Sequence, residues 1–303
     1  MTETFPLRLL PPDLTQLFGH PVELDPDQMV GLDYREAKTP EIAEVRTRLA
    51  DILSDDRVGA SGVERWEEGW AEVRARVTRE GVSEATLSPQ YFRHQTLRLH
   101  GRYIRTRSAS FEPKLYRAIK SVLFSDYLAR VPRAVEFGCG TGLNLFQLHK
   151  LFPKMSLVGS DWARPSQELV SLIADATGAD MKGVHFNMRT LEGHESIPID
   201  GTTAVLTLHA MEQLGRDFAP FIDYLIAAKP KLALHLEPIV ELYDPAKPFD
   251  ADAIAYHRKR GYLEGFLPAL RARSDIEIVE TRRLGFGAIF HEAYSLIVWK
   301  PRP

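Results

Sequence analysis

The sequence predicts an α/β fold in which a mostly helical N-terminal region precedes a domain built on a largely parallel sheet. Three observations support this prediction. After Arg133, short apolar runs alternate with helical stretches, and near the C-terminal end two strand-like runs follow one another without an intervening helix. Before residue 111, a proline-rich start leads into two amphipathic helical stretches. We therefore expect a helical cap over residues 1–111 and an α/β domain over residues 112–303.

Length and composition narrow the class of protein. A chain of 303 residues corresponds to about two domains, and 44% apolar with 26% charged residues is typical of a soluble globular protein. The net charge of −3 argues against a nonspecific nucleic-acid binder, and the single cysteine, Cys139, cannot form an intrachain disulfide. Glu3 and Pro6 interrupt the pattern of a secretion signal, and no apolar run reaches the length of a membrane helix. We expect a cytoplasmic protein without a nucleic-acid or membrane partner.

Two helices are predicted in the N-terminal region. The first covers Glu41–Leu53, with Thr39 and Pro40 in the N-cap and N1 positions. The second runs from Val63 to about Glu80, where apolar residues recur every three or four positions and predict a buried stripe of Trp66, Trp70, Val73 and Val77. Such a stripe is more typical of core packing than of ligand contact.

A basic stretch lies between Ala85 and Phe111, where the chain has no acidic residue. It contains five arginines, namely Arg93, Arg98, Arg102, Arg105 and Arg107. A solvated face that pairs with acids elsewhere is the ordinary explanation, but the rigid fork of arginine also suits a carboxylate ligand. Arg102 and Arg105, with Tyr103 between them, are therefore candidates for binding a carboxylate.

The α/β domain is predicted to begin with an amphipathic helix over Glu112–Leu128. Strands are expected at Ala134–Phe137, Met155–Gly159, Val184–Phe186, Thr203–Leu208 and Lys231–Leu236. The helical segments between them fall near Gly142–Phe152, Pro165–Thr177 and Asp217–Ala228. Repeated strand–helix units predict a parallel sheet with helices on both faces.

The C-terminal end departs from this alternation. A long helical stretch, about Asp250–Ser274, precedes strands predicted at Ile276–Arg283 and Ala288–Trp299. Gly285 and Gly287 join these strands with no helix between them, so the two strands must be antiparallel. The sheet is therefore expected to end on an antiparallel strand.

The segment with the clearest chemical meaning is Val135–Gly142, of sequence VEFGCGTG, between the first strand and the following helix. Alternating glycines let a backbone turn sharply and approach a ligand without interference from a Cβ atom. A dinucleotide-binding loop needs glycine or alanine at the sixth position of G-x-G-x-x-G, but that position is Leu143 or Leu145 here. The spacing argues against a nicotinamide oxidoreductase, and Cys139 is expected to be a small loop residue rather than a nucleophile.

An E-x-G-x-G-x-G segment after a strand, followed by an acid at the end of the second strand, resembles the class I S-adenosylmethionine-dependent methyltransferases. That acid is Asp161, nineteen residues beyond Gly142. The resemblance covers about residues 112–303 and implies a Rossmann-like methyltransferase domain with a seven-stranded sheet and an antiparallel last strand. It also implies methyl transfer as the activity and S-adenosyl-L-methionine as the cofactor. No metal is expected.

The same resemblance implies cofactor contacts at Glu136, Phe137, Gly138, Gly140, Gly142, Asp161, Trp162, Asn187, Met188 and His209. Glu136 is expected to order the loop and to approach the methionine part of the cofactor. Asp161 is expected to bind the ribose, since a carboxylate accepts two hydrogen bonds from a vicinal diol. Trp162 is expected against adenine, and Asn187, where the family more often has aspartate, near the adenine amino group. His209 is expected to flank the methyl donor.

The expected methyl acceptor is a small polar metabolite, amino-acid-like, with methionine sulfur as one option. The segment LHAMEQ after the fourth strand lacks the Asn/Asp-Pro-Pro-aromatic pattern of relatives that methylate amino groups of DNA or protein glutamine. Cytosine methylation needs a nucleophilic cysteine, and the only cysteine lies in the glycine loop. Candidate substrate-binding residues at the ends of the fourth and fifth strands are Glu212, Glu237 and Tyr243.

The expected chemistry is chiefly the positioning of an acceptor against the methyl group. His209 and Glu212 are candidates for a general base with an oxygen or nitrogen acceptor, whereas a thioether needs none. The N-terminal region resembles the lids that cover the acceptor in small-molecule methyltransferases. A methyltransferase-like binding or scaffold subunit without activity is the alternative function. A homodimer is compatible with the sequence, which does not fix the oligomeric state.

Overall fold

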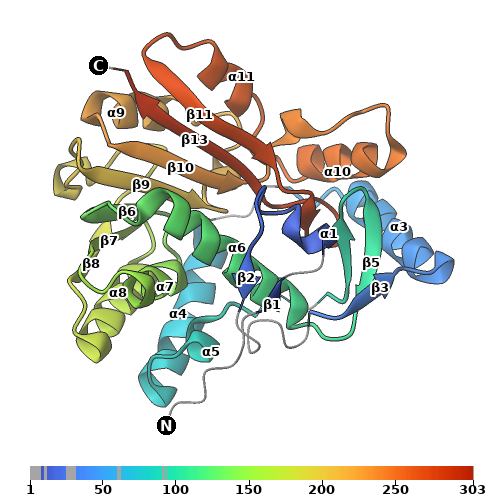
Figure 1. Ribbon diagram of the computed structural model, residues 1–303, viewed down its shortest axis with the longest axis horizontal. Coiled ribbons are helices and arrows are strands. Elements are labelled where there is room, and N and C mark those ends of the chain that lie inside the picture. The colour runs from blue at the N-terminus through green and yellow to red at the C-terminus, as the bar shows by residue number, and fades with distance from the viewer. Residues whose placement is uncertain are drawn as a thin grey trace.

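The structure, a computed structural model, describes residues 8–9, 12–24, 32–59, 63–90, 92 and 94–302. Its central element is a seven-stranded sheet of order β11-β13-β10-β9-β6-β7-β8 (Figure 1). The strands are β6 (Arg133–Phe137), β7 (Ser156–Asp161), β8 (Met181–His185), β9 (Thr203–Leu208), β10 (Leu232–Glu237), β11 (Ile276–Arg283) and β13 (Ser295–Pro301). β6 to β10 pair in parallel, while β13 pairs antiparallel with both β10 and β11. The predicted sheet with an antiparallel last strand is confirmed.

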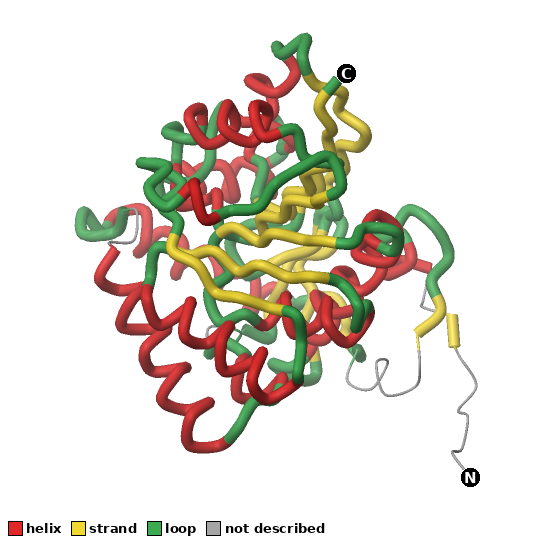
Figure 2. The backbone as a smooth tube through the Cα atoms, turned by 90° about the vertical axis from the view of Figure 1, so that its left-hand side faces the viewer, coloured by secondary structure: helices red, strands yellow, loops and turns green. Residues whose placement is uncertain are grey.

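Helices cover both faces of this sheet, as the side view in Figure 2 shows. They are α6 (Phe111–Leu128), α7 (Leu143–Leu151), α8 (Arg164–Thr177), α9 (Ala219–Ala228), α10 (Pro248–Lys259) and α11 (Phe266–Arg271). Alternate strand residues belong to two separate cores: Ala134 packs with residues of α6, α7 and α8, and its neighbour Val135 with residues of α9 and α11. Both faces are therefore apolar, as a parallel sheet between helices requires.

Two predictions for the C-terminal part are wrong in detail. The stretch Asp250–Ser274 is not one helix, because α10 ends at Lys259 and α11 begins at Phe266. Gly261 and Gly265 between them have φ of 61° and 88°, which breaks a right-handed helix. The last strand begins at Ser295 rather than Ala288, because β12 (Phe286–Gly287) leaves the large sheet and pairs with another strand.

The N-terminal region combines helices with a small sheet that the sequence did not predict. Its helices are α1 (Pro12–Thr15), α3 (Thr39–Ser54), α4 (Val63–Glu80) and α5 (Glu84–Leu87). Its strands are β1 (Arg8–Leu9), β2 (Glu23–Leu24), β3 (Tyr34–Glu36), β4 (Thr96–Leu99) and β5 (Arg102–Thr106). β12 joins β4, β5 and β3 in a four-stranded sheet, so a C-terminal segment completes an N-terminal element.

Local geometry explains two features of this region. α3 begins at Thr39, two positions before the predicted Glu41, and its N-cap is Lys38 rather than Thr39. The Glu41 carboxylate accepts a hydrogen bond from Lys38 N at 2.8 Å. β4 and β5 form a hairpin around His100-Gly101, whose φ values of 47° and 78° suit a two-residue turn.

Short 3₁₀ helices follow three strands of the large sheet: η1 (His194–Ser196), η2 (Met211–Leu214) and η3 (Val240–Leu242). Within the described residues, no helix is both long and apolar enough to cross a membrane. Nor do those residues contain a group of three or more His, Cys, Asp and Glu side chains that could hold a metal ion.

Candidate functional site

The glycine loop leaves the carboxyl end of β6 in a conformation that only glycine adopts easily. Gly138, Gly140 and Gly142 have φ of 68°, 52° and 73°. A Cβ atom on Gly138 would lie 2.4 Å from Ala210 Cβ, so the backbone approaches the segment after β9 as closely as atoms allow. The loop therefore forms a tight turn at the edge where the carboxyl ends of the parallel strands meet.

The Asp161 carboxylate, at the end of β7, is held in a fixed direction by the backbone. Its Oδ2 accepts a hydrogen bond from Gly140 N at 3.0 Å, and its Oδ1 accepts one from Ala163 N at 2.9 Å. The side chain is 5% exposed, and burial raises its pKa to about 6. Each oxygen keeps a further lone pair, so the carboxylate can still accept two hydrogen bonds from a ligand.

Glu136, in β6, is fully buried and only partly satisfied. Its Oε1 accepts a hydrogen bond from Asn144 Nδ2 at 2.6 Å, while its Oε2 accepts none from the described residues. Burial raises the pKa of this carboxyl group to about 8. A buried oxygen without a donor is costly, so Oε2 can accept a hydrogen bond that the described residues do not supply.

A tryptophan of the N-terminal region lies against the glycine loop. A Cβ atom on Gly140 would be 3.1 Å from Cζ2 of Trp70, which stacks on Trp66 with ring centroids 5.4 Å apart. Of the predicted buried stripe, Val73 and Val77 are buried, but both tryptophans are only half-buried. Since α4 also packs along α8, this helix covers the loop as well as part of the core.

The remaining predicted cofactor residues lie in different environments. Phe137 is in the core, edge-on to Phe186 and Phe221 at 4.8 and 4.9 Å, and so supports the loop from behind. Met188 Cε would be 3.5 Å from a Cβ on Gly138, which puts this thioether beside the loop.

Asn187, half-buried after β8, accepts a hydrogen bond from Arg189 N at 2.9 Å. Trp162 follows Asp161 directly and is half-buried. The Cys139 thiol is buried, and burial raises its pKa, which keeps it protonated.

His209 stands at the carboxyl end of β9 in a left-handed conformation, with φ of 58°. Its backbone N donates to Leu236 O at 3.1 Å, and its ring meets Tyr116 and Tyr294 edge-on, with centroids 5.6 and 4.9 Å away. The Nδ1 atom is 3.6 Å from a Glu212 carboxylate oxygen. The Nε2 atom is buried and makes no hydrogen bond with the described residues. A non-glycine residue in this conformation typically marks a functional position.

Two of the predicted substrate-binding residues are occupied by internal contacts. Glu237 accepts hydrogen bonds from the backbone N atoms of Ala210, Met211 and Glu212, at 3.1, 3.1 and 3.3 Å. Burial raises its pKa to about 7. It thus fixes the start of η2 and, through it, the Glu212 side chain beside His209. Tyr243 is buried, and its hydroxyl donates to the carbonyl of Glu292 at 2.8 Å.

The predicted arginine pair lies on β5 of the small sheet. Arg105 donates to Gln95 Oε1 at 2.8 Å and to Thr96 Oγ1 at 3.0 Å, and Arg102 is exposed. The Tyr103 ring packs on Phe249 at 5.0 Å. Arg105 also lies 3.7 Å from Glu41, so the contacts given for Tyr103 and Arg105 are with the small sheet, the segment before it, α3 and α10. Arg93, also in the basic stretch, lies outside the described residues.

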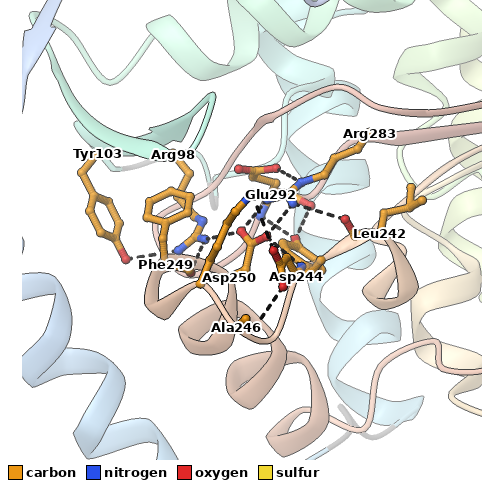
Figure 3. Close-up of polar contacts among 11 residues, drawn as sticks. Arg98, Tyr103, Leu242, Asp244, Ala246, Phe249, Asp250, Arg283 and Glu292 are labelled. Carbon is orange, nitrogen blue, oxygen red and sulfur yellow. Dashed lines mark hydrogen bonds and ion pairs between the residues drawn. The ribbon is translucent and has the colours of Figure 1, made fainter.

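A buried network of charges, shown in Figure 3, joins the small sheet to the α/β domain. Arg283 donates to both oxygens of Asp250, at 2.6 and 2.7 Å, and to Glu292 at 2.5 Å. Arg98, fully buried, donates to Phe249 O at 2.5 Å, and its guanidinium lies 4.0 Å from Asp250. This network holds the segment 288–294, which carries Tyr294 against His209.

The turn after α10 brings a cation and an acid together near His209. Arg260 Nε donates to Tyr262 Oη at 3.3 Å. Burial and the nearby Glu212 carboxylate both raise the pKa of the Tyr262 hydroxyl. On the other side of the histidine, Tyr294 Oη donates to Glu112 at 3.3 Å, and burial raises the pKa of that carboxyl to about 7.

A surface groove lies elsewhere, between α4 and α8. It measures about 620 Å³ and is lined by Arg74, Ala75, Thr78, Arg79, Glu168, Ser171, Leu172 and Asp175. None of the predicted site residues lines it. The convergence of the glycine loop, Asp161 and His209 at one sheet edge is the better indicator of a site, because ligands of open α/β sheets bind there.

Comparison with known proteins gave matches at the level of structure alone. No family model matches the chain, and no curated protein matches it. Geranyl diphosphate C-methyltransferase from Streptomyces coelicolor, solved with Mg²⁺, geranyl diphosphate and S-adenosyl-L-homocysteine, is 14% identical over 65% of this chain and 85% of its own, with a TM-score of 0.45. An SAH-bound methyltransferase from Podospora anserina is 10% identical over 89% and 100%, with a TM-score of 0.45. A 16S rRNA methylase is 13% identical over 96% and 88%, with a TM-score of 0.43.

Proposed function

We propose that this chain is an S-adenosyl-L-methionine-dependent methyltransferase that acts on a small, polar, amino-acid-like acceptor. The observation that carries the proposal is the hydrogen bond from Gly140 N to Asp161, beside the unpartnered Oε2 of Glu136. The backbone N of Gly140, the Asp161 carboxylate and Oε2 of Glu136 belong to chain segments that the sheet brings together. We propose that they bind the cofactor. The proposal rests on this geometry and on the sequence motif.

The residues of this edge fit the cofactor. Asp161 offers lone pairs to a ribose diol, and Glu136 Oε2 offers an acceptor to an ammonium group. Met188, beside the glycine loop, and Trp162, directly after Asp161, are proposed to cover the adenine. When bound, the cofactor supplies an electrophilic methyl group on its sulfonium. The chain itself then has to hold the acceptor in line and exclude water.

The surroundings of His209 suit an acceptor that carries both charges of an amino acid. Glu212 provides an acid 3.6 Å from the imidazole, and Arg260, which donates to Tyr262 at 3.3 Å, is proposed to provide the cation. The rings of Tyr116 and Tyr294 flank the imidazole and restrict the space. An acceptor with an ammonium and a carboxylate, methionine included, matches this combination of groups better than a polymer does.

The need for a base depends on the acceptor atom. An oxygen or nitrogen acceptor must lose a proton, which the buried Nε2 of His209 or the Glu212 carboxylate can accept. A thioether sulfur loses none, and the two side chains would then only orient it.

The N-terminal region, residues 1–111, is proposed as a cover for this site. The contact of Trp70 with Gly140 supports a role beside the cofactor, and Tyr103 on Phe249 supports attachment to α10. The net charge of −3 and the single buried cysteine support a cytoplasmic enzyme of small molecules rather than of nucleic acids.

The experiment that tests the function is incubation with methyl-labelled cofactor and a pooled metabolite extract, followed by identification of the labelled product by mass. We expect one small polar product, absent with the Asp161→Ala variant. Tight cofactor binding without any labelled product would instead support the non-catalytic scaffold.

A further inference from the structure

Lys120, on α6, is a buried cation next to the glycine loop. It is 2% exposed, and its Nζ donates to Asn144 Oδ1 at 2.6 Å. The same Asn144 amide donates through Nδ2 to Glu136 Oε1 at 2.6 Å. Lys120 and Glu136 are thus joined through an amide, and no ion pair within 4.0 Å links them among the described side chains. Asn144 therefore lies between the buried amine of Lys120 and the buried carboxyl group of Glu136.

The cation lies between the glycine loop and the end of β9. Its Nζ is 4.4 Å from the centroid of the Tyr116 ring, and that ring is 5.6 Å from His209. Glu136, two residues before Gly138, lies on the other side of Asn144 from Lys120. A ligand that passes from the loop toward His209 therefore runs alongside Lys120 and Glu136.

The described residues do not use the full hydrogen-bonding capacity of either group. Asn144 accounts for one of the three N–H donors of Lys120, and Glu136 Oε2 accepts no hydrogen bond from the described residues. Burial lowers the pKa of Lys120 to about 8 and raises that of Glu136 to about 8, so each is costly to keep charged. A zwitterion that presents a carboxylate to one group and an ammonium to the other would stabilise both charges at once.

We propose that Lys120 binds the carboxylate of the amino-acid end of the cofactor, while Glu136 Oε2 accepts a hydrogen bond from its ammonium group. This inference rests on the proposed function and assigns a binding residue that lies outside the sequence motif. Lys120 and Glu136, which lie on either side of Asn144, then bind the amino-acid end of the ligand, and Asp161 binds its ribose.

The test compares two ligands that differ by one carboxylate. S-adenosylhomocysteine carries the complete amino-acid end, and S-adenosyl-3-thiopropylamine keeps the amine but lacks the carboxylate. Their dissociation constants are measured by calorimetry for the wild-type protein and for Lys120→Met. We expect the wild type to prefer the homocysteine compound by about 10- to 100-fold, and Lys120→Met to lose that preference by binding this ligand more weakly and the amine unchanged.

Controls separate the inference from folding and from the function itself. Lys150→Met, on α7, removes an exposed lysine that pairs with Glu84 at 3.2 Å and should leave both constants unchanged. Lys120→Arg keeps the charge and should keep part of the preference. If Lys120→Met does not fold, Lys120→Gln replaces it in the same comparison of the two ligands. Equal affinity of the wild type for the two ligands overturns the inference but not the function. Equal weakening of both ligands by Lys120→Met does the same. If neither ligand binds to the wild type, the proposed function is overturned as well.

Discussion

Gly140 and Asp161 meet through one hydrogen bond of 3.0 Å, from the backbone N of the glycine to a carboxylate oxygen. This contact joins the loop after β6 to the end of the neighbouring parallel strand β7. It requires the positive φ of Gly140 and an acid at position 161, and the bond to Ala163 N fixes the other oxygen. The two halves of the motif are therefore one unit, and disturbance of either should affect the same ligand.

Replacing Gly138 with alanine should disrupt this unit. The new Cβ would lie 2.4 Å from Ala210 Cβ, and the backbone φ of 68° is unfavourable for alanine. Strain of about 1–3 kcal/mol must be relieved by movement of the loop. We expect the affinity for S-adenosylhomocysteine, measured by calorimetry, to fall at least about tenfold. Gly201→Ala is the matched control, because its Cβ would meet nothing within 4 Å and its φ is not positive. Equal binding by the two variants would contradict the role of the loop.

Binding of S-adenosylhomocysteine should depend on pH through Asp161. Burial raises the pKa of this carboxyl from 3.8 to about 6, so the unliganded folded protein carries it protonated at acidic pH. The ionised form is the better acceptor for a diol, so affinity should fall by about tenfold per pH unit as the pH drops below about 6. The raised pKa has the opposite effect on the stability of the unliganded protein. Protonated Asp161 contributes to the free energy of unfolding below about pH 4, and this contribution is lost as the pH rises through about 6. Asp161→Asn should bind weakly and lack this step, and a wild-type affinity that stays constant across this range would argue against the contact.

The buried network around Arg283 should contribute strongly to stability. Arg283→Met removes the cation that neutralises Asp250 and Glu292, whose side chains are 4% and 0% exposed. Breaking a buried pair on one side costs about 3–5 kcal/mol of unfolding free energy, which urea denaturation measures. Arg273→Met is the control, because its partners Asp223 and Asp275 are 62% and 48% exposed and such pairs contribute less than about 1 kcal/mol. Similar losses in the two variants would show that the network is not specially stabilising.

The pH profile of the reaction should identify the acceptor atom. With an oxygen or nitrogen acceptor, the rate should fall at acidic pH as His209 or Glu212 gains a proton, and His209→Asn should lower kcat. With a sulfur acceptor, the rate should be nearly constant with pH, and His209→Asn should raise KM more than it lowers kcat. Steady-state kinetics over a range of pH distinguishes the two cases. A pH-dependent rate that His209→Asn and Glu212→Gln both leave unchanged would show that neither side chain is the base.

Much of the α/β domain was predictable because its signals are local. Strong apolar runs set β9 at Thr203–Leu208 and β11 at Ile276–Arg283 with the predicted bounds, and the helix-free link near Gly285 gave the antiparallel end. The small sheet was missed because β3 to β5 are only three to five residues long, and because β4 and β5 lie within the basic stretch. Its one local signal was His100-Gly101, a two-residue hairpin turn between alternating apolar residues.

The candidate site was predictable where a motif fixes backbone geometry, and less so where long-range packing decides. Glu136, the three glycines and Asp161 come from adjacent strands of one sheet, so their meeting follows from topology. The burial of Lys120 depends on how α6 packs on α7, and the approach of Arg260 to Glu212 depends on a break in a helix that the sequence presented as continuous. Neither has a local signature. For the Arg102 and Arg105 pair, the contacts of Arg105 with Gln95, Thr96 and Glu41 depend on the small sheet and α3, and a role of the pair in binding stays a prediction.

Calorimetric titration with S-adenosylhomocysteine, on the wild-type protein and on Asp161→Ala, tests the central claim most directly. The account predicts one ligand per chain for the wild type. The affinity should be at least about tenfold lower in the variant, because it lacks the carboxylate that accepts two hydrogen bonds from the ribose diol. A wild-type protein that gives no heat and no thermal shift, or a variant that binds as tightly as the wild type, would contradict it.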